Sequence, residues 1–254
     1  MKLLTLARDL QRRRSRERQK LFVVEGVRSV EELLRSRLSV EGAVTGPALG
    51  TTPRGEALRA SLAAAGVPIL DVNERDFASA ASTESPQGVL AIARIPEGDI
   101  ASFDVPAQAR ILVLDAIQDP GNVGTLVRTA AAFGVSATLA MPGTVDLWNG
   151  KVVRSSMGAL FHHPTGNCTW HELDEFLAGR AIPLWGADAD GDELGSIEPP
   201  FPPRLAIAVG NEGAGLSADA STRLARTVAI RTCPDVESLN VAVAAGILLH
   251  HFRS

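Results

Sequence analysis

The second half of the chain alternates short apolar runs with longer segments in which apolar residues recur at helical spacing. The runs predict strands and the periodic segments predict helices. Strands that alternate with helices indicate a parallel sheet covered on both faces, so an α/β fold is expected. The predicted strands are 111–115, 136–141, 182–186, 205–209 and 227–231. The predicted helices are 123–133, 149–160, 171–179, 217–225 and 238–252.

The first part of the chain predicts a smaller α/β unit, with strands near 22–24, 42–44, 67–70 and 89–93. Between Pro96 and Ala109 the apolar periodicity stops, and the prolines and glycine there are typical of a linker. We therefore expect a domain at 1–95, a linker at 96–109 and a second domain at 110–254.

Composition narrows the class of protein. The chain has 254 residues, of which 45% are hydrophobic, and no run of 18 apolar residues, so no membrane span is expected. Arg8 interrupts the first apolar residues before they reach the length of a signal peptide. Cys168 and Cys233 form no disulfide framework, which favours the cytoplasm. The five histidines lack metal-ligand spacing, so no metal is expected.

The net charge of −4 hides a basic arm near the N-terminus. Residues 8–20 hold seven basic and two acidic side chains, whereas the rest of the chain is acidic. A basic arm on an acidic body is typical of a protein that contacts nucleic-acid phosphates, although it is also typical of a solvated helix face. The candidate RNA contacts are Arg12, Arg13, Arg14, Arg16, Arg18 and Lys20.

The segment 119–130 directly follows the apolar run at 111–114. Pro120 and Gly121 predict a turn, and Asn122 is expected to cap the helix that follows. Arg128 then lies on the polar side of that helix. Ligands bind at the carboxyl ends of strands in open α/β sheets, so this segment is a candidate site, against the alternative of a surface helix with a solvated arginine.

Two later segments have the same placement. The strand 205–209 leads into three glycines within six residues, which would let a backbone approach a ligand closely. A dinucleotide fingerprint at 213–218 is a weak match, because only 36 residues follow it. Ser238 and Asn240 stand at the start of the last helix, where they could bind a ligand or only cap the helix.

Together these segments resemble the three ordered motifs of the SpoU (TrmH-like) ribose 2′-O-methyltransferases of the SPOUT superfamily. The motifs are 119–124 with Arg128, 209–216 and 237–241. Residues 154–161 resemble the family's connecting helix, and 22–28 and 85–89 resemble its ribosomal-protein-like substrate-binding domain. The resemblance covers nearly the whole chain.

The resemblance implies methylation of a ribose 2′-hydroxyl with S-adenosylmethionine, a C-terminal trefoil knot and a homodimer. Ribosomal RNA is favoured over transfer RNA because of the two-domain layout. Where the family has Ile-Pro-Met, this chain has Ile230-Arg231-Thr232. The cofactor positions carried over are Gly210, Asn211, Ile230 and Leu239. The polar active-site positions carried over are Asn122, Arg128, Glu212, Ser238 and Asn240.

The resemblance assigns the proton acceptor to Arg128. A guanidinium has a pKa above about 12, so orientation of a phosphate or stabilisation of a forming alkoxide suits it better. Glu212 is the carboxylate that could orient Arg128 or accept the proton through water. The alternatives are a transfer-RNA methyltransferase, a catalytically silent RNA-binding or ribosome-assembly protein on the same fold, and a dinucleotide oxidoreductase.

Overall fold

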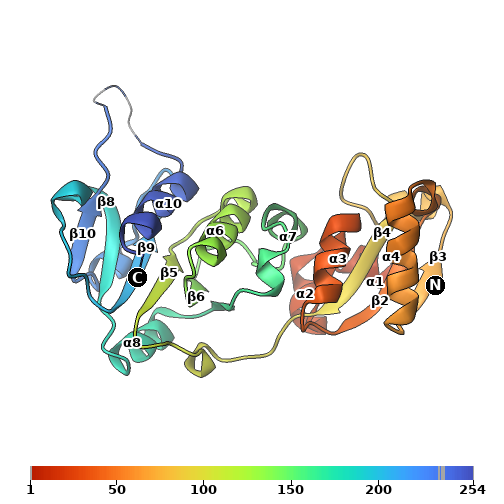
Figure 1. Cartoon of the computed structure of the whole chain (residues 1–254), viewed down its shortest axis with the longest axis horizontal. Coiled ribbons are helices and arrows are strands. Elements are labelled where there is room, and N and C mark those ends of the chain that lie inside the picture. Colours follow the sequence, from red (N-terminus) through yellow and green to blue (C-terminus); the bar gives the residue numbers. More distant parts are fainter. Residues whose placement is uncertain (1, 234, 236–237, 254) are drawn as a thin grey trace. The chain divides into compact units, whose positions relative to one another are not determined.

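The computed structural model describes residues 2–233, 235 and 238–253. The chain divides into two compact units, whose helices and strands are drawn in Figure 1. The N-terminal unit holds the residues up to 97 together with 148–162. The C-terminal unit holds 98–147 and the chain from 163 onward. The connecting segment 148–162 is thus part of the N-terminal unit, although in sequence it lies between strands of the C-terminal sheet.

The N-terminal unit is built on a mixed four-stranded sheet in the order β1-β4-β2-β3. Strand β4 is antiparallel to β1 and β2, whereas β2 and β3 are parallel. Five of the six residues of β4 are buried, as its central position requires. The strands are β1 Leu21–Glu25, β2 Val40–Thr45, β3 Ile69–Asp71 and β4 Val89–Arg94. The α-helices are α1 Lys2–Asp9, α2 Arg13–Gln19, α3 Val27–Arg35, α4 Pro53–Ala64, α5 Glu74–Ala78 and α7 Gly150–Ser155.

The basic arm is two short helices, α1 and α2, and one of its arginines is not on the surface. Arg16 is 4% exposed, and its guanidinium donates to the carbonyls of Leu10 (2.8 Å) and Gln11 (3.0 Å). The expectation that Arg16 contacts RNA therefore does not fit this structure. The cause is an apolar stripe, Leu4, Ala7 and Leu10, which buries the arm's first helix and leaves carbonyls at its end for Arg16 to satisfy.

The C-terminal unit contains a six-stranded, fully parallel sheet in the order β10-β8-β9-β5-β6-β7. The predicted parallel sheet is therefore confirmed. Strand β7 was not predicted, because its sequence Thr-Gly-Asn has no apolar residue. Strand β8 extends into charged residues that pair with β10 after a register shift. The strands are β5 Ala109–Leu114, β6 Ala137–Ala140, β7 Thr165–Asn167, β8 Leu184–Glu193, β9 Arg204–Val209 and β10 Arg226–Ala229.

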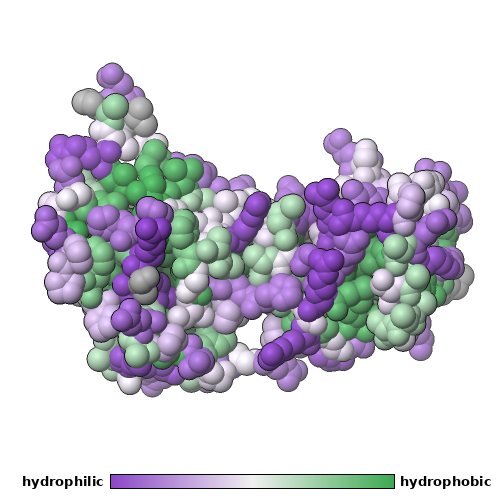
Figure 2. Space-filling view, in the orientation of Figure 1, coloured by the Kyte–Doolittle hydropathy of each residue, from purple (hydrophilic) through white to green (hydrophobic). Residues whose placement is uncertain are grey.

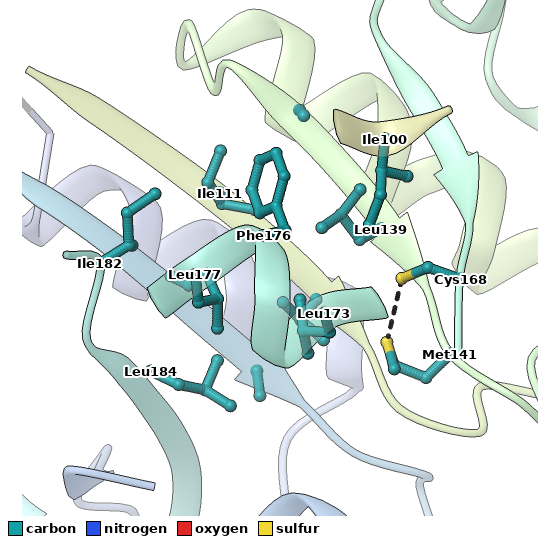
Figure 3. Close-up of a cluster of buried hydrophobic side chains, with 14 residues drawn as sticks. Ile100, Ile111, Leu139, Met141, Cys168, Leu173, Phe176, Leu177, Ile182 and Leu184 are labelled. Carbon is teal, nitrogen blue, oxygen red and sulfur yellow. Dashed lines mark hydrogen bonds between the residues drawn. The ribbon is translucent and has the colours of Figure 1, made fainter. Parts of the chain in front are cut away.

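The sheet of the C-terminal unit is buried on both faces. On one face, helix α8 inserts Leu173, Phe176 and Leu177 into a cluster with residues of β5, β6 and β9 (Figure 3). Cys168 lies in this cluster with its sulfur 3.6 Å from that of Met141. Every residue of β5 is buried, so the opposite face is covered too, as expected for a central parallel strand. The α-helices are α6 Pro120–Ala132, α8 Trp170–Ala178, α9 Ala218–Ser221 and α10 Val241–His251, and α10 packs against α6.

Several helix limits differ from the predicted ones for local reasons. Helix α6 begins at Pro120, and Asp119 is its N-cap, accepting from the amide of Asn122 at 2.8 Å. The expectation that Asn122 caps this helix was wrong, because proline suits the first helical position and moves the start upstream. Helix α7 ends early because Met157 and Gly158 have positive φ. Among the described residues, no helix is both long and apolar enough to cross a membrane.

Candidate active site

The candidate site lies where the strand order of the C-terminal sheet reverses. Strands β5 and β9 are neighbours, and the sheet continues from them in opposite directions. Such a switch point opens a crevice between the loops that leave the two strands. Here the loops are tied together: the Asp115 carboxylate accepts from the amide of Ser217 at 2.6 Å, and Asn211 Nδ2 donates to the carbonyl of Ala116 at 3.1 Å. The loops after β5 and β9 are therefore joined to each other by side-chain hydrogen bonds.

The glycine-rich loop after β9 is closed on itself. Asn211 and Gly215 exchange two backbone hydrogen bonds of 2.9 Å, and Asn211 Oδ1 accepts from the amides of Gly213 and Ala214 at 2.9 and 3.1 Å. A Cβ at Gly210 would lie 2.3 Å from the carbonyl of Gly215, so no other residue fits there without a backbone shift. The side chain of Asn211 is used entirely within the loop and the adjacent Ala116 turn.

Three polar side chains from distant segments form a hydrogen-bonded chain. Asn122 Nδ2 donates to Glu212 Oε1 at 2.5 Å, and Asn240 Nδ2 donates to Asn122 Oδ1 at 2.9 Å. We call this the Asn122–Glu212–Asn240 chain. Its direction is set at one end, because Asn240 Oδ1 caps helix α10 by accepting from the amides of Ala242 and Val243. The amide group of Asn240 must then point toward Asn122, and that of Asn122 toward the carboxylate.

The other two predicted polar residues lie outside this chain. Arg128 is exposed on α6 and makes no hydrogen bond or ion pair with any residue that the structure describes. It is six positions after Asn122, which places it about 120° away around the helix. Ser238 is exposed and likewise has no hydrogen-bond partner within the described part of the chain. The structure therefore joins three of the five residues by hydrogen bonds and leaves the other two outside that chain.

The predicted cofactor positions belong to three separate segments. Gly210 follows β9, Ile230 follows β10, and Leu239 precedes α10. Strands β9 and β10 both flank β8, so Gly210 and Ile230 leave the same edge of the sheet. Within the described residues, no hydrogen bond links the main chain of Gly210, Ile230 or Leu239 to that of another of these three. Pro234, Val236 and Glu237, the last of which is in the third motif, lie outside the described residues.

Arg231, one of the two departures from the family pattern, anchors this segment. Its Nη2 lies 2.8 Å from a carboxylate oxygen of Glu193 at the end of β8, and this hydrogen bond raises the pKa of Arg231. The pair therefore connects the residues after β10 to the neighbouring strand. Both side chains are exposed, so the connection contributes little to stability.

The predicted RNA contacts other than Arg16 lie on the surface of the N-terminal unit. Arg12, Arg14, Arg18 and Lys20 are exposed. Arg13 is exposed as well, and its Nε lies 2.7 Å from Glu17 one helical turn away. Five exposed basic side chains on or next to one short helix give a surface that can approach phosphates.

Sequence reasoning from the residues alone missed Asp115 and Arg154. Asp115 is 1% exposed and is one of the two side chains that join the loops after β5 and β9. Its position as the first polar residue after a buried strand was the available signal. Arg154 was named only as part of the connecting helix, and nothing in that helix indicated its contact with Glu25 in the N-terminal unit.

Comparison with known proteins gives matches to both parts of the chain. Residues 109–250 match the model of the SpoU rRNA Methylase family, and residues 5–91 match that of the MRM3-like substrate binding domain. The chain is 32% identical over 247 residues to the 23S rRNA (guanosine(2553)-2′-O)-methyltransferase RlmP of Bacillus subtilis, covering 97% of this chain and 94% of that protein.

Two solved structures extend this likeness to the fold. An AdoMet-bound rRNA methyltransferase from Sinorhizobium meliloti is 25% identical with a TM-score of 0.85, covering 99% of this chain and 94% of that one. A putative RNA methyltransferase of the TrmH family from Porphyromonas gingivalis is 29% identical with a TM-score of 0.79, covering 98% and 96%. Sequence and fold thus agree over almost the entire chain.

Proposed function

This chain belongs to the SpoU rRNA methylase family and is a ribosomal RNA 2′-O-ribose methyltransferase, and we propose that the Asn122–Glu212–Asn240 chain is its methyl-transfer site. The observation that carries the proposal is the pair of hydrogen bonds that joins Glu212 to Asn122 and Asn122 to Asn240. It collects polar groups from three motifs at the switch point of the sheet, where ligands bind in this class of fold.

The residues around Gly210 fit S-adenosylmethionine. Gly210 packs directly against the backbone of Gly215 and Leu216, so the loop has no side chain at this position and offers only main-chain groups there. The hydrogen bonds of Asn211 hold the loop in one shape, so it presents these groups without reorganisation, which lowers the entropic cost of binding. We assign cofactor contacts to the main chain at Gly210, Ile230 and Leu239, with Asn211 acting through the shape of its loop. When bound, the cofactor supplies an electrophilic methyl group on a sulfonium.

The polar residues have separate roles in activating the ribose hydroxyl. A neutral hydroxyl is a weak nucleophile, so a neighbouring group must take or share its proton. Glu212 is the one carboxylate in the Asn122–Glu212–Asn240 chain, and it accepts the proton directly or through water. Asn122 and Asn240 hold that carboxylate in place by an oriented relay of amide groups. Ser238 offers a hydroxyl beside Asn240 that can orient the ribose.

Arg128 suits charge stabilisation better than proton transfer. Its guanidinium has no hydrogen-bond or ion-pair partner in the described part of the chain, so it is available to a phosphate or a forming alkoxide. Its place outside the Asn122–Glu212–Asn240 chain means that it reaches the reaction by binding RNA or by entering the site of a second protomer.

A homodimer is part of the proposal because an apolar surface on α6 and α10 is uncovered. Phe133, Val243 and Ile247 are 37%, 52% and 38% exposed, and with Gly246 they line a shallow hollow. Figure 2 shows hydrophobic side chains gathered over α10. Exposed apolar patches of this kind are typical of protein interfaces. We propose that two copies of the chain pair through this surface.

The N-terminal unit is proposed to bind RNA. Its exposed arginines and lysine on α2 and the match of residues 5–91 to a substrate-binding domain support this role. The domain limits at 1–95, 96–109 and 110–254 and the trefoil knot are carried forward as predictions.

The test of the proposed site is methyl transfer to 23S ribosomal RNA taken from cells that lack this protein. Glu212→Gln should lower kcat by about 100-fold or more, because it removes the proton acceptor but keeps the size of the side chain. Cofactor affinity measured by calorimetry should stay within twofold of wild type. Glu175→Gln, at an exposed carboxylate on α8, is the matched control. Normal turnover by Glu212→Gln would contradict the assignment.

A further inference from the structure

The N-terminal unit contains a cavity of about 520 Å³ that takes no part in the methyl-transfer site. It opens between the start of α3, the turn at 82–87 and the connecting segment 148–162, all within one compact unit. Its volume is in the range of sites for small organic molecules, about 300–1,000 Å³. Its lining combines three arginines, the carboxylates of Glu25 and Glu32, and the exposed Met157.

A buried cluster of polar groups fixes one wall of the cavity. The side chain of Glu25 is 5% exposed and accepts from the amide and the hydroxyl of Ser82, at 2.9 and 2.5 Å, and from those of Thr83. Arg154 Nη1 donates to Ser82 Oγ at 2.5 Å and lies 3.7 Å from Glu25. Since a guanidinium has five donors, these contacts hold Arg154 in place and leave donors for a ligand.

A second arginine of the cavity has its charge available. Arg28, in the first turn of α3, is exposed and has no hydrogen bond or ion pair with a described residue. Arg54 also lines the cavity, but its Nε and Nη2 both donate to the carboxylate of Glu31. These hydrogen bonds lower the pKa of Glu31. Arg28 and the anchored Arg154 are therefore the two groups that can hold an anion, and arginine is well suited to bind phosphate oxygens in pairs.

The cavity also has an apolar wall in a strained conformation. Met157 lines the cavity and is 55% exposed. Its backbone φ is +52°, a value that residues other than glycine rarely adopt. The next residue, Gly158, is close-packed, because a Cβ there would lie 2.8 Å from Glu32. Strain of this kind persists where the surrounding structure enforces it and is concentrated at ligand sites. A polarisable thioether beside two arginines is suited to the face of a planar base.

We propose that this cavity binds one nucleotide of the RNA substrate, with its phosphate at Arg28 and Arg154 and its base against Met157. The inference rests on the proposed function for the identity of the ligand as RNA. A phosphate ion alone would leave most of the cavity and its apolar wall without a role. The cavity would also make the connecting segment a part of RNA recognition, because Arg154 and Met157 both come from it.

The experiment measures binding of deproteinised 23S ribosomal RNA, from cells that lack this protein, as a function of salt concentration. Arg28→Ala should weaken binding by about tenfold and reduce the slope of log affinity against log salt by about one. Arg28→Lys should keep the slope but not the full affinity, because lysine cannot bind a phosphate in the same two-pronged way. Met157→Ala should weaken binding by about threefold or more with no change in slope, because it removes an uncharged contact.

The matched control is Arg37→Ala, which removes an exposed, unpaired arginine of the same unit that does not line the cavity. It should change affinity by less than twofold. Equal effects of Arg28→Ala and Arg37→Ala would overturn the inference, and an unchanged Met157→Ala would overturn the base contact. These failures can be told apart from failure of the proposed function, since wild-type protein that binds but does not methylate this RNA contradicts only the latter.

Discussion

The two units hold their polar residues in opposite ways. In the C-terminal unit, Glu212 is exposed and is held by one hydrogen bond from Asn122. In the N-terminal unit, Glu25 is buried and accepts from four groups, two amides and two hydroxyls. A carboxylate with one partner can exchange it for a substrate hydroxyl, whereas one with four partners is fixed. Substitutions of Glu212 should therefore lower turnover, and substitutions of Glu25 should lower stability.

The largest effect is expected in the candidate site of the C-terminal unit. Arg128→Ala should lower methyl transfer by about 1,000-fold, because it removes the cation that we propose stabilises the forming alkoxide or holds a phosphate. Cofactor affinity should be nearly unchanged, since the assigned contacts are main-chain groups in other segments. Calorimetry with S-adenosylmethionine and a methyl-transfer assay measure the two separately. Loss of cofactor affinity in this variant would contradict the separation of roles.

A mixture of two inactive variants tests where Arg128 acts. If it enters the site of the partner protomer, mixing Arg128→Ala with Glu212→Gln restores one intact site in each mixed dimer, or about a quarter of all sites at random pairing. If it acts within its own chain, mixing restores nothing. Because neither residue lies in the apolar surface of α6 and α10, both variants should still form the proposed dimer, which ultracentrifugation can check.

The fixed carboxylate should show the converse behaviour. Glu25→Ala leaves four donors without their acceptor and removes the carboxylate that pairs with Arg154, and breaking a buried charged cluster typically costs about 3–5 kcal/mol. Thermal unfolding followed by far-ultraviolet circular dichroism should show a lower Tm for Glu25→Ala. Glu41→Ala, which removes one exposed pair with Arg94, should change the Tm little. Equal Tm values for the two variants would contradict the prediction that the buried carboxylate contributes more to stability than the exposed one.

The C-terminal unit also buries a titratable group, but in its neutral form. His163 is 9% exposed, its Nε2 lies 2.8 Å from Thr138 Oγ1, and burial lowers its pKa to about 4. Between pH 6.5 and 4 the unfolded chain binds a proton that the folded chain does not, so the free energy of unfolding falls as pH falls through this range. The contribution is at most about 3 kcal/mol.

Denaturant unfolding at several pH values measures this contribution. His163→Gln, which does not titrate, should lose less stability than wild type between pH 6.5 and 4. His171→Gln serves as the control, because its side chain is 83% exposed on α8 and its curve should run parallel to wild type. Parallel curves for all three proteins would mean that His163 is accessible to protons in the folded state.

The sequence predicted elements whose burial is complete and missed those made by long-range contacts. Strands β5 and β9 were predicted because their residues are almost all apolar, as central parallel strands require. The charged end of β8 was missed because only its pairing with β10 makes it a strand. Likewise, the N-cap of α6 is Asp119 and not Asn122. The reason is that Pro120 is the first residue of the helix, so the residue before it is the cap.

The candidate site divides in the same way. The resemblance selected Asn122, Glu212 and Asn240, and the structure joins them by hydrogen bonds across more than 100 positions of sequence between Asn122 and Asn240. Local pattern cannot supply that closeness, because it depends on β5 and β9 being neighbours in the sheet. The cavity at Arg28 could not be predicted from the sequence either, because one of its walls comes from a segment about 125 positions later in the chain.

The smallest effect is expected within the basic arm, and it sharpens the comparison to a single helix. Arg14 is exposed and Arg16 is buried, two positions apart on α2. Arg14→Gln should weaken RNA binding by about threefold and lower its salt slope, with no change in Tm, because it removes one proposed phosphate contact. Arg16→Gln should instead lower the Tm, because the carbonyls of Leu10 and Gln11 lose their donors. If Arg16→Gln keeps its Tm but shows the salt slope expected of Arg14→Gln, the buried position of Arg16 does not hold in solution, and the arm is one continuous RNA-binding surface.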